Sequence, residues 1–181
     1  MATTFKPFGL KPAYHPSGLD RAVPFVGTNS FQAATDNTYN APYSLSSGQA
    51  FYQYQPVGLN SSNQLTIAAT SATGGSAGTV YGVFDGVEFT DSQGRRSVAK
   101  WAAKTTLDAS TQIVFWIFQD PALVYEIQVN GSANANAIGS EYNFDTTSGS
   151  SVTDGYIIGT GGAGFSTTAL LATPVASGAV G

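Results

Sequence analysis

The sequence has no cysteine among its 181 residues and only one histidine. The absence of cysteine excludes disulfides, thiolate nucleophiles and cysteine-ligated metals, and it fits assembly in a cytoplasm. A single histidine excludes a histidine-rich metal site and leaves His15 as the only base for a Ser-His-Asp triad. His15 lies between Tyr14 and Pro16, where extended backbone offers little scaffold to orient a base. We therefore interpret His15 as a surface or packing residue, and we expect no catalytic site and no cofactor.

Charged residues are also scarce, at 10% of the chain compared with roughly 25% in ordinary soluble domains. Helix surfaces usually carry many charged side chains, so this scarcity disfavours a helical bundle. What the chain does contain is 21 Gly, 9 Tyr, 11 Phe and abundant Ser and Thr, which favour turns and strands. We predict an all-β fold, a single β-sandwich or jelly-roll-like domain with extended N- and C-terminal arms.

The net charge of −4 and the pI near 4.6 provide no positive field for phosphate backbones or anionic lipids. The strongest apolar run, Ile113–Phe118, is far shorter than the ~20 residues that span a bilayer. The start of the chain shows no secretory signal pattern. We therefore expect neither nucleic acid nor membrane as a partner.

Proline and glycine divide the chain into three parts. Five of the eight prolines precede residue 43, which predicts an extended arm over residues 1–26. Residues 27–158 form the predicted β-rich core domain, and residues 159–181, rich in Gly, Ala, Ser and Thr, form a flexible C-terminal arm. The glycine-rich stretch Gly159–Gly164 lacks the Lys-Ser/Thr ending of a phosphate-binding loop, so we reject that function for it.

The clearest strand pattern runs through the middle of the chain. Asp91–Gly94 is a strong turn signal, Asp85 and Gly86 indicate a turn or a bulge, and Pro121 pre-sets a turn. We predict a hairpin of the two apolar strands that flank Pro121. The predicted strands are Leu65–Ala69, Val80–Val83, Val87–Thr90, Gln112–Phe118 and Leu123–Val129.

Three carboxylates lie close together in the sequence, at Asp85, Glu88 and Asp91. Such a cluster suits calcium or glycoside hydrolysis, but the spacing is not that of an EF-hand, and Asp85 and Asp91 have the sequence context of turn residues. We interpret all three as solvated turn carboxylates.

Four of the seven basic residues flank Trp101. They form either a solvated rim beside a buried tryptophan, a patch that docks on acidic protein groups, or a nucleic-acid contact, and the acidic chain disfavours the last. These residues are Arg95, Arg96, Lys100 and Lys104.

Several segments share an order of motifs with a known group of proteins. The segment Lys6-Pro-Phe-Gly-Leu-Lys-Pro12, followed by His15-Pro-Ser-Gly18, resembles the opening of small tailed-phage head proteins. Gly82–Asp91, the Trp101 segment, Gln119–Gln128 and Ala137-Ile-Gly139 are similar to the middle of those proteins, in the same order. Several members of that group are capsid cement, or decoration, proteins.

The resemblance implies a virion structural protein on the outer capsid surface, which binds neighbouring major capsid proteins and stabilises the mature shell. It implies a β core with arms that cross subunit boundaries, and no catalytic residues. We expect a homo-oligomer, with a trimer at local three-fold axes favoured. The capsid contacts that we predict are Phe5, Lys6, Pro7, Phe8, Leu10, Arg95, Arg96 and Lys100.

The alternative is a carbohydrate-binding β module of an adhesin or a phage tail. It would use Tyr52, Tyr54, Trp101 or Trp116 as a sugar-stacking platform, and it requires coplanar aromatic rings exposed to solvent. A glycosidase is the least favoured class, because it needs two carboxylates roughly 5 to 10 Å apart and no spacing predicts such a pair.

Overall fold

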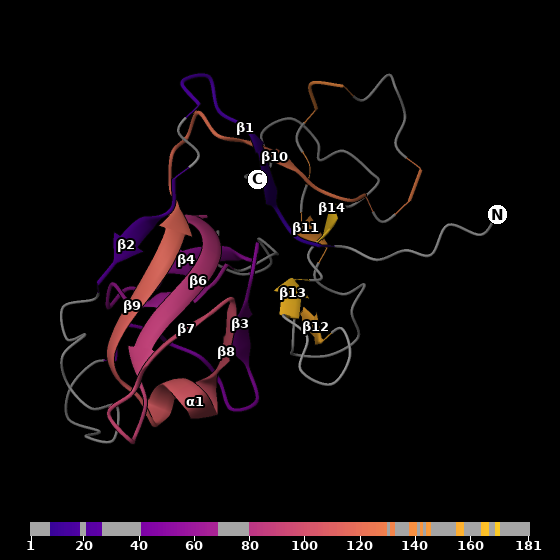
Figure 1. Cartoon of the computed structure of the whole chain (residues 1–181). Coiled ribbons are helices and arrows are strands. Elements are labelled where there is room, and N and C mark those ends of the chain that lie inside the picture. Colours follow the sequence, from indigo (N-terminus) through magenta and orange to yellow (C-terminus); the bar gives the residue numbers. More distant parts are fainter. Residues whose placement is uncertain are drawn as a thin grey trace.

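The computed structural model describes residues 8–18, 21–26, 41–68, 80–129, 131–132, 138–140, 142, 144–145, 155–157, 164–166 and 169–170. The predicted all-β fold is confirmed: strands dominate these segments, and their only helix is the five-residue α1 (Figure 1). The elements are β1 (Lys11–Tyr14), β2 (Val23–Phe25), β3 (Ala50–Tyr52), β4 (Pro56–Leu59), β5 (Leu65–Ile67), β6 (Gly82–Thr90), β7 (Arg96–Ala99), β8 (Trp101–Ala103), α1 (Lys104–Asp108), β9 (Thr111–Phe118), β10 (Val124–Glu126), β11 (Phe144–Asp145), β12 (Gly155–Ile157), β13 (Gly164–Ser166) and β14 (Ala169–Leu170).

A six-stranded antiparallel sheet forms the main layer, with the strand order β2-β9-β6-β4-β5 and with β7 also paired to β6. Strand β6 is its centre. Strand β9 runs along one edge of β6, and β4 and β7 follow one another along the other edge. Close packing at Gly82 requires a residue without a side chain, because a Cβ there would lie 2.5 Å from Ile117 Cγ2.

The turn and bulge signals in the sequence correspond to real features. Of the two possibilities for Asp85 and Gly86, the structure has a bulge, so β6 continues through both residues. The predicted Asp91–Gly94 turn is confirmed: the Gly94 N–H donates to the Asp91 carbonyl, and Asp91 Oδ1 accepts the Gln93 N–H. This turn joins β6 to β7.

The predicted hairpin around Pro121 is wrong. Strand β9 pairs with β6 on one edge and, at residues 115–117, with β2 on the other, so no edge remains there for β10. Strand β10 pairs instead with β1, near the beginning of the chain. The short turn at Pro121 therefore connects two strands of different sheets.

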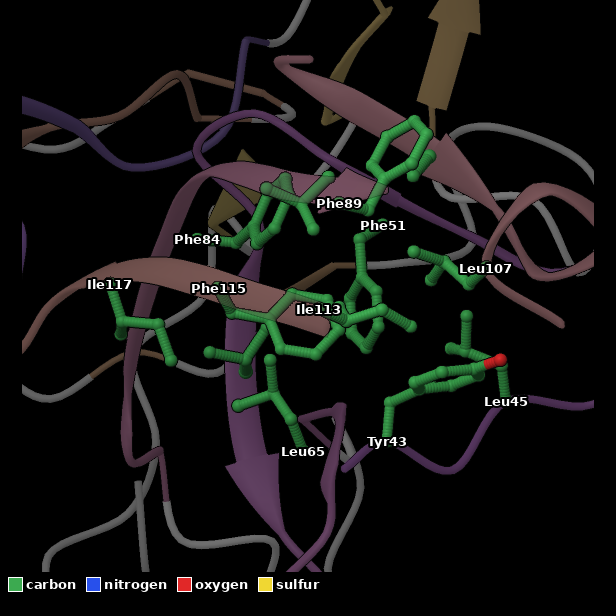
Figure 2. Packing of buried hydrophobic residues seen from close by; sticks show 13 residues of the cluster. Tyr43, Leu45, Phe51, Leu65, Phe84, Phe89, Leu107, Ile113, Phe115 and Ile117 are labelled. Carbon is green, nitrogen blue, oxygen red and sulfur yellow. The ribbon is translucent and has the colours of Figure 1, made fainter. Parts of the chain in front are cut away.

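A two-stranded ribbon of β3 and β8 forms the second layer and covers the inner face of the main sheet. Phe51 of β3 stacks on Phe84 of β6, with ring centroids 5.5 Å apart, and meets Phe115 of β9 edge-on. Figure 2 shows these rings at the centre of the buried cluster. Burying such aromatic groups is the main stabilising term of the fold.

The segment predicted as the N-terminal arm contributes β1 and β2, which pair with β10 and β9. The β1–β10 ribbon lies beyond the end of the main sheet (Figure 1). Within the segment predicted as the C-terminal arm, β13 pairs with β12 and β14 pairs with β11.

Candidate functional site

The turn after β1 and the turn before β10 are joined by His15, Ser17, Asp120 and Ala122, and we call this group the His15 junction. The Ser17 N–H donates to His15 Nδ1 at 3.1 Å, so this nitrogen carries a lone pair and the proton lies on Nε2. His15 Nε2 then donates to Asp120 Oδ2 at 3.0 Å. The His15 side chain is only 6% exposed, so the ring is fixed within the fold.

The electrostatics of this junction favour an ionised Asp120. The Ala122 N–H, which donates to Asp120 Oδ1 at 2.8 Å, and then His15 lower the pKa of the carboxyl below its ordinary 3.8. Nearby, burial and then the negative charge of Asp120 raise the pKa of Tyr125 to about 12. The junction is thus organised around one carboxylate.

Ser17, His15 and Asp120 have the composition of a catalytic triad, and Ser17 Oγ lies 2.8 Å from His15 Nδ1. The local amides are committed elsewhere, however: the Ser17 N–H donates to His15, the Gly18 N–H to the His15 carbonyl and the Ala122 N–H to Asp120. These three amides are therefore not free to stabilise an oxyanion. The arrangement acts as a cap that fixes the turn after β1 to the turn before β10.

Leu10, one of the predicted N-terminal contact residues, is attached to the core. The Leu10 N–H donates to the Tyr54 carbonyl at 2.8 Å, and its side chain packs against the cluster of Val83, Phe118 and Leu123. Leu10 therefore attaches the segment to the chain's own core, and Phe8 beside it is half-buried. Phe5, Lys6 and Pro7 lie outside the described residues.

The outer face of the β1–β10 ribbon carries an exposed apolar pair. Tyr14 and Val124 are cross-strand partners, and they are 61% and 52% exposed. Lys11 and Glu126 are partners further along the ribbon. The sequence analysis missed this surface, because its residues come together only when β10 pairs with β1.

The basic residues around Trp101 are all paired with carboxylates of the same chain. Lys100 contacts Asp85 at 2.9 Å, Arg95 contacts Asp91 at 2.8 Å, and Lys104 contacts Asp108 at 2.6 Å. Arg96 pairs with Glu88. The interpretation of Asp85 and Glu88 as turn carboxylates is wrong, because both lie on β6. Each positive charge is balanced locally, so this region has little net field for an acidic or nucleic-acid partner.

The aromatic residues suggested for sugar stacking do not form one exposed platform. Tyr52 is buried and stacks on Trp101, with the ring planes 11° apart. Both lie on the β3–β8 ribbon, whereas Trp116 lies on β9 next to the inward-facing Phe115 and so points to the opposite, outer face of the main sheet. Tyr54 is half-buried and packs, as Leu10 does, against the cluster of Val83, Phe118 and Leu123.

In the part of the chain that the structure describes, no three His, Asp or Glu residues converge as metal ligands. No helix in the same segments is long and apolar enough to cross a membrane.

Comparison with protein-family models, curated proteins and solved structures finds no match to this chain.

Proposed function

We propose that the protein is a virion structural protein that decorates a bacteriophage capsid and cements neighbouring major capsid proteins on the outer surface of the mature shell. In this proposal it acts as a clamp, without catalysis and without a cofactor. The favoured assembly is a trimer at local three-fold axes.

One observation carries this proposal. The motifs that resemble phage head proteins, His15-Pro-Ser-Gly18 and Gln119–Gln128, lie more than a hundred residues apart in sequence but adjoin each other in the fold. They are joined by the β1–β10 pairing and by the His15–Asp120 hydrogen bond. Motifs that build one structural unit have a physical reason to occur together in a sequence. Their contact in the fold therefore strengthens the resemblance to phage head proteins.

The same structural unit supports the proposed clamp. Leu10 and the His15 junction hold the base of the N-terminal segment, so Phe5, Lys6 and Pro7 are the residues proposed to reach a capsid subunit. The exposed Tyr14 and Val124 pair is proposed to lie against the shell beside them. Once one contact with the capsid has formed, the other contacts form at a raised effective concentration, so several weak contacts together bind tightly. A protein that binds only the mature shell also stabilises that shell by mass action.

The experiment that tests the proposal is co-sedimentation of the purified protein with expanded phage heads that lack it and with unexpanded proheads. Saturable binding to expanded heads alone is the expected result. Absence of binding to both kinds of particle would contradict the proposal.

Two variants separate the proposed contacts. Deletion of residues 1–7 removes Phe5, Lys6 and Pro7 but keeps the Leu10 hydrogen bond to Tyr54, so binding is expected to fall while the urea midpoint stays unchanged. A triple Arg95→Gln, Arg96→Gln and Lys100→Gln variant tests the predicted basic contacts. If these residues touch the shell, binding falls and loses salt dependence. If they serve only their internal pairs, binding is retained.

A further inference from the structure

A surface pocket of about 230 Å³ lies where β6, β7 and β9 approach the Asp91–Gly94 turn. It belongs neither to the His15 junction nor to the β1–β10 ribbon. Its lining consists of Glu88, Phe89, Thr90, Arg96, Gln112 and Val114. Four of the six lining residues are polar or charged.

Strand β9 has a bulge beside the pocket, and the bulge contains the lining residue Gln112. Glu88 pairs with Val114 and Thr90 pairs with Thr111, so β9 has one residue more than β6 between these partners. Gln112 lies in the bulge with φ 51°, a left-handed conformation that is uncommon for residues other than glycine. A bulge redirects a side chain and bends the strand. Here it brings the Gln112 amide to Thr90, whose Oγ1 donates to Gln112 Oε1 at 3.2 Å.

The charges in the pocket cancel each other. Glu88 and Arg96 form an ion pair across the two strands, and the Glu88 side chain is only 14% exposed. An anionic ligand would be attracted by Arg96 but repelled by Glu88, and a cationic ligand would meet the reverse. The balanced pair therefore favours an uncharged ligand.

The hydrogen-bonding groups define the class of that ligand. The Glu88 carboxylate accepts hydrogen bonds, Arg96 and the Gln112 amide nitrogen donate them, and Val114 adds an apolar wall. Neighbouring hydroxyl groups of a ligand can pair with these carboxylate, guanidinium and amide groups, because each hydroxyl both donates and accepts hydrogen bonds. The volume corresponds to about eight waters at roughly 30 Å³ each, which is the scale of one small ring.

We propose that this pocket binds one neutral pyranose ring of a glycan. The proposal does not depend on capsid binding, since it uses a different part of the molecule. It also differs from the aromatic platform considered from the sequence, because polar side chains of three strands provide the recognition.

The test is a titration of the ¹⁵N-labelled full-length protein, followed by ¹⁵N–¹H NMR, with D-glucose, D-galactose, L-rhamnose and N-acetyl-D-glucosamine in turn. At least one sugar is expected to give saturable shifts, with a millimolar Kd, confined to the amides of the six lining residues and their neighbours. If none of the four shifts these signals, or if the shifts map to another surface, the proposal is overturned.

Two variants and one control make the test specific. Gln112→Gly removes the amide while it suits the positive φ, and Thr90→Val removes only the hydroxyl, so each is expected to weaken binding at least fivefold in a folded protein. Thr66→Val on β5, outside the pocket, should leave the Kd unchanged. Unchanged binding in both pocket variants, or tighter binding of D-glucuronate than of D-glucose, would contradict a neutral-sugar site.

Discussion

His15 and Asp120, 105 positions apart in the sequence, are joined by a hydrogen bond of 3.0 Å from Nε2 to Oδ2. The bond lies next to the β1–β10 pairing, and the amides on either side of it fix both partners. A two-stranded ribbon is marginally stable by itself. The His15 junction therefore contributes to holding β1 on β10.

His15→Ala and Asp120→Ala are each expected to loosen β1, because each removes one partner of this bond. Amide hydrogen exchange should accelerate in Lys11–Tyr14 and remain slow in β6 and β9. A double-mutant cycle monitored by urea unfolding should show that the two losses are not additive. Strictly additive losses would mean that the two residues act independently.

Acid should destabilise the protein through Asp120 and Asp91. The pKa of Asp120 is lowered by the Ala122 N–H and His15, and the pKa of Asp91 is lowered chiefly by the Arg95 N–H. A pKa lower in the folded state means that the stabilisation is complete above the unfolded value of 3.8 and is lost as the pH falls through the folded value. Urea midpoints should therefore decrease below about pH 4. Asp91→Asn and Asp120→Asn should reduce this decrease, and an unchanged acid profile in the double variant would contradict the assignment.

Alkali should destabilise the protein in part through Tyr125, together with Tyr43 and Tyr54, whose pKa values are also raised, chiefly by burial. Its pKa rises from 10.0 to about 12 on folding, because burial and the Asp120 carboxylate disfavour the phenolate. A pKa raised in the folded state means that the stabilisation is present below pH 10 and is lost as the pH rises toward 12. Tyr125→Phe should make the urea midpoint less sensitive to pH in this window, whereas Tyr14→Phe on the exposed face provides a matched control. Equal sensitivity in the wild type and Tyr125→Phe would argue against this origin.

Gly82→Ala is expected to destabilise the main sheet by about 1–3 kcal/mol, the usual cost of overpacking. The new Cβ would lie 2.5 Å from Ile117 Cγ2 and 2.6 Å from the Phe118 carbonyl oxygen. Gly94→Ala is a useful comparison, since no atom lies within 4 Å of its Cβ and only its φ of 78° opposes the change, at about 1 kcal/mol. Thermal or urea unfolding measures both, and a larger loss at Gly94 would contradict the packing explanation.

Phe51→Ala should remove the contact between the two layers and reduce the free energy of unfolding by about 3–5 kcal/mol. Its ring is fully buried between Phe84 and Phe115. Val98→Ala on the outer face, where the side chain is 72% exposed, should change stability by less than about 0.5 kcal/mol. Similar urea midpoints for the two variants would exclude Phe51 as a central core residue.

Local signals in the sequence predicted the Asp91–Gly94 turn, because a turn depends on residues next to one another. At Asp85 and Gly86 the same signals left a turn and a bulge open, and only the pairing of β6 with β9 distinguishes the two. The partner of β10 could not be predicted in this way. It depends on tertiary packing, since β2 and β6 occupy both edges of β9 and leave no edge there for β10. For the same reason, the Glu88–Arg96 pair and the pocket at Gln112 required the register of β6, β7 and β9.

The pairing of β1 with β10 also constrains how the chain is made. Lys11 faces Glu126, so β1 must wait for a partner synthesised 115 residues later. Strand β2 likewise waits for β9. During translation both N-terminal strands have unsatisfied edges, and contacts of such long sequence separation form slowly. Pairing of β1 therefore follows synthesis of β10, and a polypeptide stalled before Leu123 would contain the partner of β2 but not the partner of β1.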